Sequence, residues 1–129
     1  MLGIREPAIY GNRSYSDLED CIMDYCRGKG VDCDIFQSNY EGEIIDEIQS
    51  AYMQVDAIVI NAAAYTHTSI AIMEAIKAVN IRAVEVHLSD ISAREDFRKV
   101  SYVGMACEKC FYGKGFDSYI EALEYLICS

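Results

Sequence analysis

The chain has 129 residues, of which 52% are hydrophobic, so it is long enough for one domain with a substantial core. Its net charge of −10 argues against nucleic-acid and anionic-membrane partners, because such binding relies on Lys and Arg. No apolar run is long enough to predict a membrane span, and the first residues lack the pattern of a secretory signal. We therefore expect a cytoplasmic protein.

The chain contains six cysteines: Cys21, Cys26, Cys33, Cys107, Cys110 and Cys128. Cys107 and Cys110 have the spacing of a redox motif or of half a zinc site, but no second pair or nearby His completes four ligands. The composition is also not that of a small disulfide scaffold. We interpret the cysteines as reduced thiols and expect no metal site.

Helical and strand patterns alternate along the chain, which predicts an α/β fold with a mainly parallel sheet. Ser16 and Glu19 form a capping-box pattern before a first helix that ends near Gly28. Residues 31–35 then alternate apolar and acidic side chains, which is typical of an edge strand. The remaining pattern predicts helices over 44–52, 71–79, 92–98 and 119–127, and strands over 57–60, 83–88 and 110–112.

The first fifteen residues do not look like a buried strand. They are polar and include Gly3, Pro7 and Gly11, which favour a loop. A flavodoxin-like sheet has the strand order 2-1-3-4-5, so its first strand is central. We expect a flavodoxin-like parallel sheet flanked by helices, with that central strand missing from a single, N-terminally shortened domain over residues 1–129.

Glu85 and His87 are the strongest chemical signal in the sequence. They lie two residues apart on a predicted strand and therefore share one face, while Val84 and Val86 share the other. A carboxylate beside an imidazole fixes its tautomer and favours its protonated form, which prepares a general acid. The alternative is a solvated polar face on an outer strand.

Other candidate residues follow the predicted strands, where α/β sheets bind ligands. Asn61 closes the strand over 57–60, and His67 precedes the next helix. Thr68 and Ser69 either cap that helix or help its N-terminus to bind an anion. In the opening loop, Arg5 could lower the pKa of Tyr10 and make its phenolate a base on a lid, although a lid tyrosine alone is commonly a packing residue.

The order of these motifs resembles the type II 3-dehydroquinate dehydratases over nearly the whole chain. The matching blocks are Arg5-Glu6-Pro7 with Tyr10-Gly11, residues 37–43, Asn61 with residues 65–69, residues 84–89, Arg94-Glu95 with Phe97-Arg98, and Ser101-Tyr102. The resemblance implies trans-dehydration of 3-dehydroquinate to 3-dehydroshikimate through an enolate, in the shikimate pathway or in quinate catabolism. It also implies a reaction without cofactor or metal, and a dodecamer built from trimers.

The resemblance also implies roles for individual residues. Tyr10 is similar to the family's base, with Arg5 lowering its pKa, and His87 to the general acid, with Glu85 orienting it. The residues implied in substrate binding are Asn61, His67, the backbone N–H groups of Leu88 and Ser89, and Arg98. Glu74 corresponds to an acidic residue that in some relatives reaches the neighbouring subunit's site.

The chain departs from the family pattern in two places. The family's first strand, with an Asn that helps to stabilise the enolate, would precede Met1. Asn61-Ala62-Ala63-Ala64 replaces Asn-Pro-Gly-Ala, so we expect a looser turn behind Asn61. The main alternative to an active dehydratase is therefore a related protein that binds or assembles without turnover. A phosphoacceptor module is disfavoured because Asn61 occupies the position of a required acidic residue.

Overall fold

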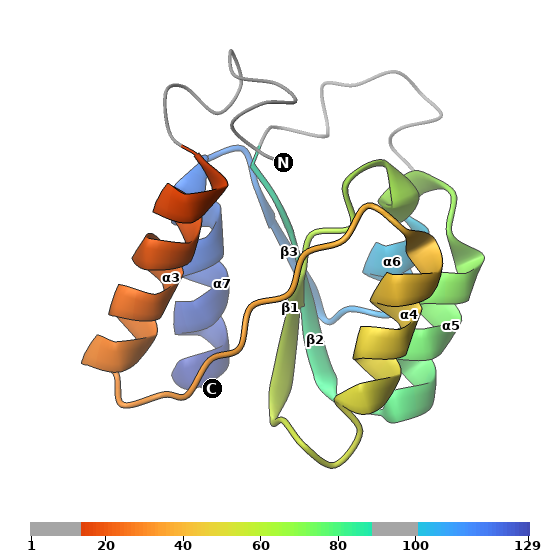
Figure 1. Ribbon diagram of the computed structural model, residues 1–129, viewed down its shortest axis with the longest axis horizontal. Coiled ribbons are helices and arrows are strands. Elements are labelled where there is room, and N and C mark those ends of the chain that lie inside the picture. Colours follow the sequence, from red (N-terminus) through yellow and green to blue (C-terminus); the bar gives the residue numbers. More distant parts are fainter. Residues whose placement is uncertain (1–13, 89–100) are drawn as a thin grey trace.

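The computed structural model describes residues 14–88 and 101–129, which form a parallel sheet flanked by helices (Figure 1). The strands are β1 Ala57–Ile60, β2 Arg82–His87 and β3 Lys109–Tyr112. The helices are α3 Tyr15–Gly28, α4 Glu41–Ser50, the 3-10 helix η1 Ala63–His67, α5 Ile70–Val79, α6 Tyr102–Met105 and α7 Phe116–Ile127. The predicted mixed α/β architecture is confirmed.

β2 is the middle strand of the described sheet. The order is β1-β2-β3, and both pairings are parallel. Ile60 pairs with Glu85, and Glu85 pairs in turn with Cys110. Because residues paired across a sheet share a face, this register decides which side chains of β2 and β3 meet.

The two faces of the sheet are covered by different helices. α3 and α7 lie on one side in Figure 1, and α4, α5 and α6 lie on the other. Val84 and Val86 point toward α7 and pack with Ala122. The opposite face contributes Ala83 to a core with Ile72 and Ile76 of α5. The alternation along β2 thus separates an apolar face from the face that carries Glu85 and His87.

The first helix begins earlier than the sequence predicted. Its N-cap is Ser14, whose hydroxyl accepts from the N–H of Asp17 while the Asp17 carboxylate accepts from the N–H of Ser14. Ser16 and Glu19 lie inside the helix, so the predicted capping box was wrong by two residues. Ser14 with Asp17 and Ser16 with Glu19 are both a serine followed three residues later by an acidic residue. The two patterns overlap, which explains the error.

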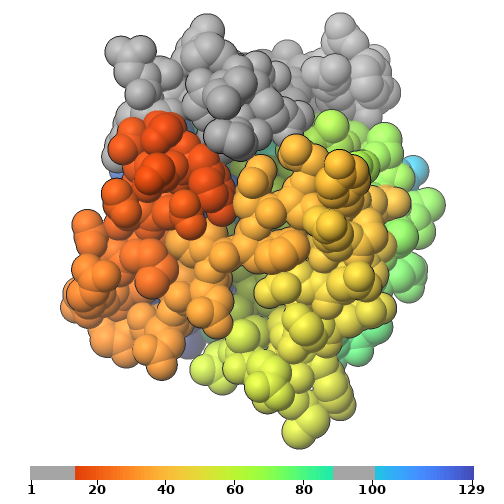
Figure 2. Space-filling view, in the orientation of Figure 1, coloured from red at the N-terminus to blue at the C-terminus, as the bar shows by residue number. Residues whose placement is uncertain are grey.

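The predicted edge strand over residues 31–35 was wrong, since the described residues 31–38 have no strand assignment. Its side-chain alternation is nevertheless present: Cys33 and Ile35 pack against the α3–α7 core, whereas Asp32 and Asp34 are exposed. A strand requires a hydrogen-bonded neighbour as well as a pattern. In Figure 2 this segment crosses the front of the molecule between α3 and α4.

Two described elements were not predicted, η1 and the short helix α6. The expected helix over 92–98 and the expected absence of a first strand concern residues outside the described ranges. Among the helices that the structure describes, none has the length and hydropathy to cross a membrane.

Candidate active site

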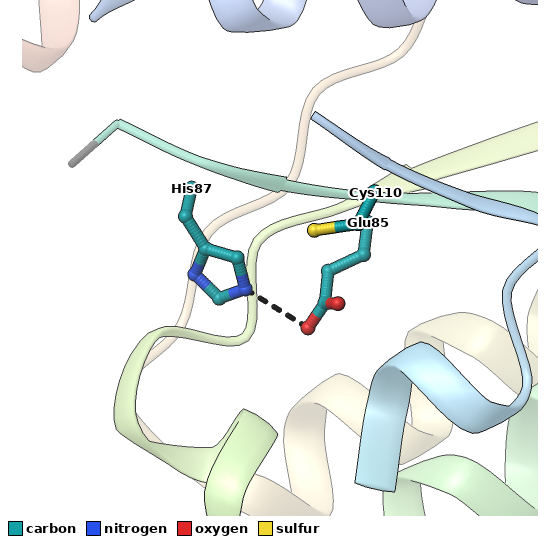
Figure 3. Close-up of side chains that lie close together, drawn as sticks. All are labelled: Glu85, His87 and Cys110. Carbon is teal, nitrogen blue, oxygen red and sulfur yellow. Dashed lines mark hydrogen bonds and ion pairs between the residues drawn. The ribbon is translucent and has the colours of Figure 1, made fainter. Parts of the chain in front are cut away.

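β2 places Glu85 and His87 side by side in the interior. His87 Nε2 lies 2.9 Å from Glu85 Oε2, and the two residues are 5% and 1% exposed. Figure 3 shows the ring edge turned toward the carboxylate, with the other ring nitrogen facing away from it. The alternative of a solvated polar face is wrong, because both residues are buried: α6 packs against β2, and Thr66 of η1 contacts Glu85.

The Glu85 carboxylate is held by two hydroxyl groups in addition to His87. Ser101 Oγ donates to Oε2 at 2.7 Å, and Thr66 Oγ1 donates to the same oxygen. Thr66 comes from η1, and Ser101 is the N-cap of α6, so two elements distant in sequence meet at one oxygen. This network leaves Glu85 little freedom to rotate away from His87.

These hydrogen bonds keep Glu85 ionised. Burial alone would raise the pKa of its carboxyl, but the hydrogen bonds from His87, Ser101 and Thr66 outweigh burial and lower the pKa from 4.5 to about 2. A carboxylate that is charged at neutral pH stabilises a positive charge on the neighbouring imidazole. The pair therefore places an ionised carboxylate against His87 Nε2 and fixes which ring nitrogen faces it.

Gly104 allows α6 to approach this network closely. A Cβ at position 104 would lie 2.8 Å from Glu85 Oε1 and 2.9 Å from Ser101 Oγ, closer than real Cβ contacts. The Gly104 N–H donates to Ser101 Oγ at 2.8 Å, which aims the hydroxyl. A glycine is thus needed here for space.

Asn61 is held by two hydrogen bonds, although Ala62 and Ala63 stand where the family pattern has Pro and Gly. Its Oδ1 accepts from the N–H of Ala63 at 3.0 Å, and its Nδ2 donates to the Tyr119 hydroxyl at 3.1 Å. Ala63 adopts a left-handed φ of 52°, which a glycine would adopt without cost. The left-handed backbone of Ala63 places strain in this turn, and the looser turn behind Asn61 stays a prediction.

The neighbouring candidates lie around the same strand ends. His67 is buried in η1, and Ser69 caps α5 by accepting from the N–H of Ile72 at 2.9 Å, as the capping interpretation predicted. The Leu88 carbonyl accepts from the N–H of Gly115 at 3.0 Å, which ties the end of β2 to the start of α7. Glu74 is on the exposed side of α5, with no contact to the Glu85–His87 pair among the described residues.

Four predicted site residues, Arg5, Tyr10, Ser89 and Arg98, lie outside the described residues. Conversely, sequence reasoning gave no role to Thr66, Ser101 or Gly104. Thr66 and Ser101 lie in the blocks that resemble the family, but their spacing in the sequence did not show that both would contact Glu85. Sequence spacing also gave no sign that Cys110 lies beside Glu85.

Comparisons with known proteins show the family to which the chain belongs. The family Dehydroquinase class II matches residues 1–127. A 3-dehydroquinate dehydratase from Clostridium beijerinckii is 50% identical over 127 residues, covering 98% of this chain and 87% of the relative. One from Caldicellulosiruptor bescii is 53% identical over 124 residues, covering 95% and 86%. The crystal structure of a type II dehydroquinase from Butyrivibrio crossotus is similar with a TM-score of 0.93 and 45% identity, covering 99% of this chain and 89% of that one.

Proposed function

Because the chain belongs to the class II dehydroquinase family, we infer that it is a 3-dehydroquinate dehydratase, a lyase that removes water from 3-dehydroquinate. The observation that carries this inference is the buried Glu85–His87 pair at the carboxyl end of β2. The alternative of a related protein without turnover receives no support from these relatives, which are named as dehydratases.

His87 acts as the general acid in the proposed mechanism. Glu85 binds its Nε2–H, so the opposite nitrogen carries the proton that is delivered to the leaving hydroxyl group. Glu85 is itself oriented by Ser101 and Thr66, and it holds the ring in one tautomer. Each proton transfer of this kind contributes typically ~10²–10⁴-fold to the rate.

Tyr10 is the proposed base, and Arg5 lowers the pKa of its phenol so that it removes the proton beside the ketone. The product, 3-dehydroshikimate, then forms through an enolate. We assign the Leu88 and Ser89 N–H groups to the substrate carboxylate, and the side chains of Asn61, His67 and Arg98 to the ring hydroxyls and the carboxylate. The hydrogen bonds that hold Asn61 and the fixed end of β2 at Leu88 support these assignments.

Further proposals concern fold and assembly. The three described strands are consecutive and parallel, which agrees with the last three positions of the order 2-1-3-4-5 in one domain. A cytoplasmic dodecamer built from trimers is the proposed assembly, and exposed Glu74 is the residue that would reach a neighbouring subunit's site. Light scattering should then give a mass of about twelve times 14.5 kDa.

The test of the activity is direct, because the product is a conjugated enone that absorbs in the ultraviolet. We expect absorbance to rise when the protein is incubated with 3-dehydroquinate. Tyr10→Phe should lower kcat by ~10²–10⁴-fold, since the base is lost. Tyr40→Phe is the matched control, because Tyr40 is 69% exposed and has no role in the proposed mechanism.

Two results would contradict the proposal. A folded sample that shows no absorbance change at high enzyme concentration would exclude the dehydratase activity. Turnover by Tyr10→Phe equal to that of the unmodified protein would leave the activity in place but remove Tyr10 as the base.

A further inference from the structure

Cys110 joins Glu85 and His87 in a three-residue cluster. The register of β2 and β3 pairs Glu85 with Cys110, so both side chains and that of His87 lie on one face of the sheet. One ligand atom from each residue lies within 4.8 Å of the other two. Figure 3 shows the sulfur on the same side as the imidazole and the carboxylate.

The three donors are an imidazole nitrogen, a carboxylate oxygen and a thiol sulfur. This combination suits borderline and soft divalent cations such as Zn²⁺ and Cd²⁺, whereas Mg²⁺ and Ca²⁺ prefer oxygen ligands alone. Bond lengths of about 2.0–2.3 Å to zinc place tetrahedral ligands about 3.3–3.8 Å apart. Small side-chain rotations would bring the cluster to that spacing. Three protein ligands leave a fourth position open for water.

We propose that Glu85, His87 and Cys110 form a binding site for a thiophilic divalent cation, Zn²⁺ or Cd²⁺, whose occupancy inhibits the enzyme. Inhibition rests on the proposed dehydratase function, whereas binding does not. The ion forms bonds to His87 Nε2, to a Glu85 oxygen and to Cys110 Sγ. The protons on Sγ and Nε2 pass to solvent, and no electron is transferred.

The inhibition follows from which nitrogen the cation takes. Nε2 is the nitrogen that faces Glu85, so the ion displaces the hydrogen bond between His87 and Glu85. The ring then retains one proton, at Nδ1, and giving it away would leave an imidazolate anion. A metal-bound His87 is consequently a much poorer acid than the imidazolium that the reaction uses.

Substituting Cys110 tests metal binding separately from catalysis, because Cys110 has no part in the proposed mechanism. Burial, assisted by the negative charge of Glu85 and by a hydrogen bond to its carboxylate, raises the pKa of the thiol to about 12, so the thiol is protonated and unreactive without metal. A serine hydroxyl at position 110 can donate to Glu85 in the same way. Cys110→Ser is therefore expected to keep the metal-free activity. Cys128→Ser is the matched control, because Cys128 is an exposed cysteine at the C-cap of α7.

The experiment titrates Cd²⁺ into the reduced full-length protein and records the thiolate-to-cadmium charge-transfer absorbance. We expect a band that saturates near one Cd²⁺ per chain, is retained in Cys128→Ser and is lost in Cys110→Ser. In turnover assays, Zn²⁺ should inhibit the unmodified protein at least ~10-fold more strongly than Cys110→Ser, because removing one metal ligand costs about 10-fold or more in affinity. Circular dichroism checks that both variants fold.

The outcomes are distinguishable. Absence of the band, or an equal band in Cys110→Ser, would overturn the site. A Cys110-dependent band with equal Zn²⁺ inhibition of both proteins would overturn the inhibitory role. A Cys110-dependent band in a protein without metal-free turnover would support the site and contradict the proposed function instead.

Discussion

Replacing Glu85 with Gln should make the free energy of unfolding depend less on pH in the acid range. The pKa of Glu85 is 4.5 ordinarily and about 2 in the folded protein. Between these values the unfolded chain binds the extra proton, so stability rises with pH. The contribution of Glu85 is fully present above pH 4.5 and is lost as pH falls toward 2. At about 1.4 kcal/mol for each tenfold change in proton affinity, it is on the order of 3 kcal/mol.

The assay is urea unfolding followed by far-ultraviolet circular dichroism at several pH values between about 2 and 7. The free energy of unfolding of Glu85→Gln should be less dependent on pH, so that its deficit against the unmodified protein is about 3 kcal/mol larger at neutral pH than near pH 2. The amide also has effects on stability that do not depend on pH. These effects cancel, because the deficit at one pH is subtracted from the deficit at the other. Glu47→Gln, an exposed change on α4, should leave the pH dependence unaltered. Equal pH dependence in Glu85→Gln and the unmodified protein would refute the reasoning.

Three further substitutions test the surroundings of the site. Ala63→Gly should stabilise the protein by about 1 kcal/mol because it relieves a left-handed φ of 52°; a lower melting temperature would contradict the strain. Ser69→Ala should cost about 1 kcal/mol in urea unfolding, since the N–H of Ile72 loses its cap, and unchanged stability would argue against that cap. Gly104→Ala should lower kcat by displacing Glu85, while Gly42→Ala, at an open position, should not; equal kcat for both variants would show that the contact is tolerated.

The buried parts of the fold were predictable because their sequence patterns are local. The strand over 57–60, the strand that carries Glu85, and α5 each show the periodicity of their element, and tertiary packing agrees with it. The shared face of Glu85 and His87 followed from the two-residue period of a strand. These features need no knowledge of distant contacts.

The features that could not be predicted depend on contacts between residues that are distant in the sequence. Residues 31–35 have a strand pattern, yet a strand also needs a partner, and the pattern cannot report one. Ser101 meets Glu85 sixteen residues away in sequence, and Cys110 meets it through the register of β3. Register across a parallel sheet is set by the whole fold, so the cluster on β2 and β3 emerges only in three dimensions.

The Ser101 hydroxyl limits how far this protein could be engineered. It starts α6 by accepting from the N–H of Gly104 and, in the same position, donates to Glu85. Thr is the one other standard residue with a similarly placed hydroxyl. Asp would start the helix as well as Ser does, but its carboxylate could not donate to Glu85 and would repel it. Selection for a more stable variant at position 101 would therefore act on catalysis as well, and thermostabilising libraries should leave this serine unchanged.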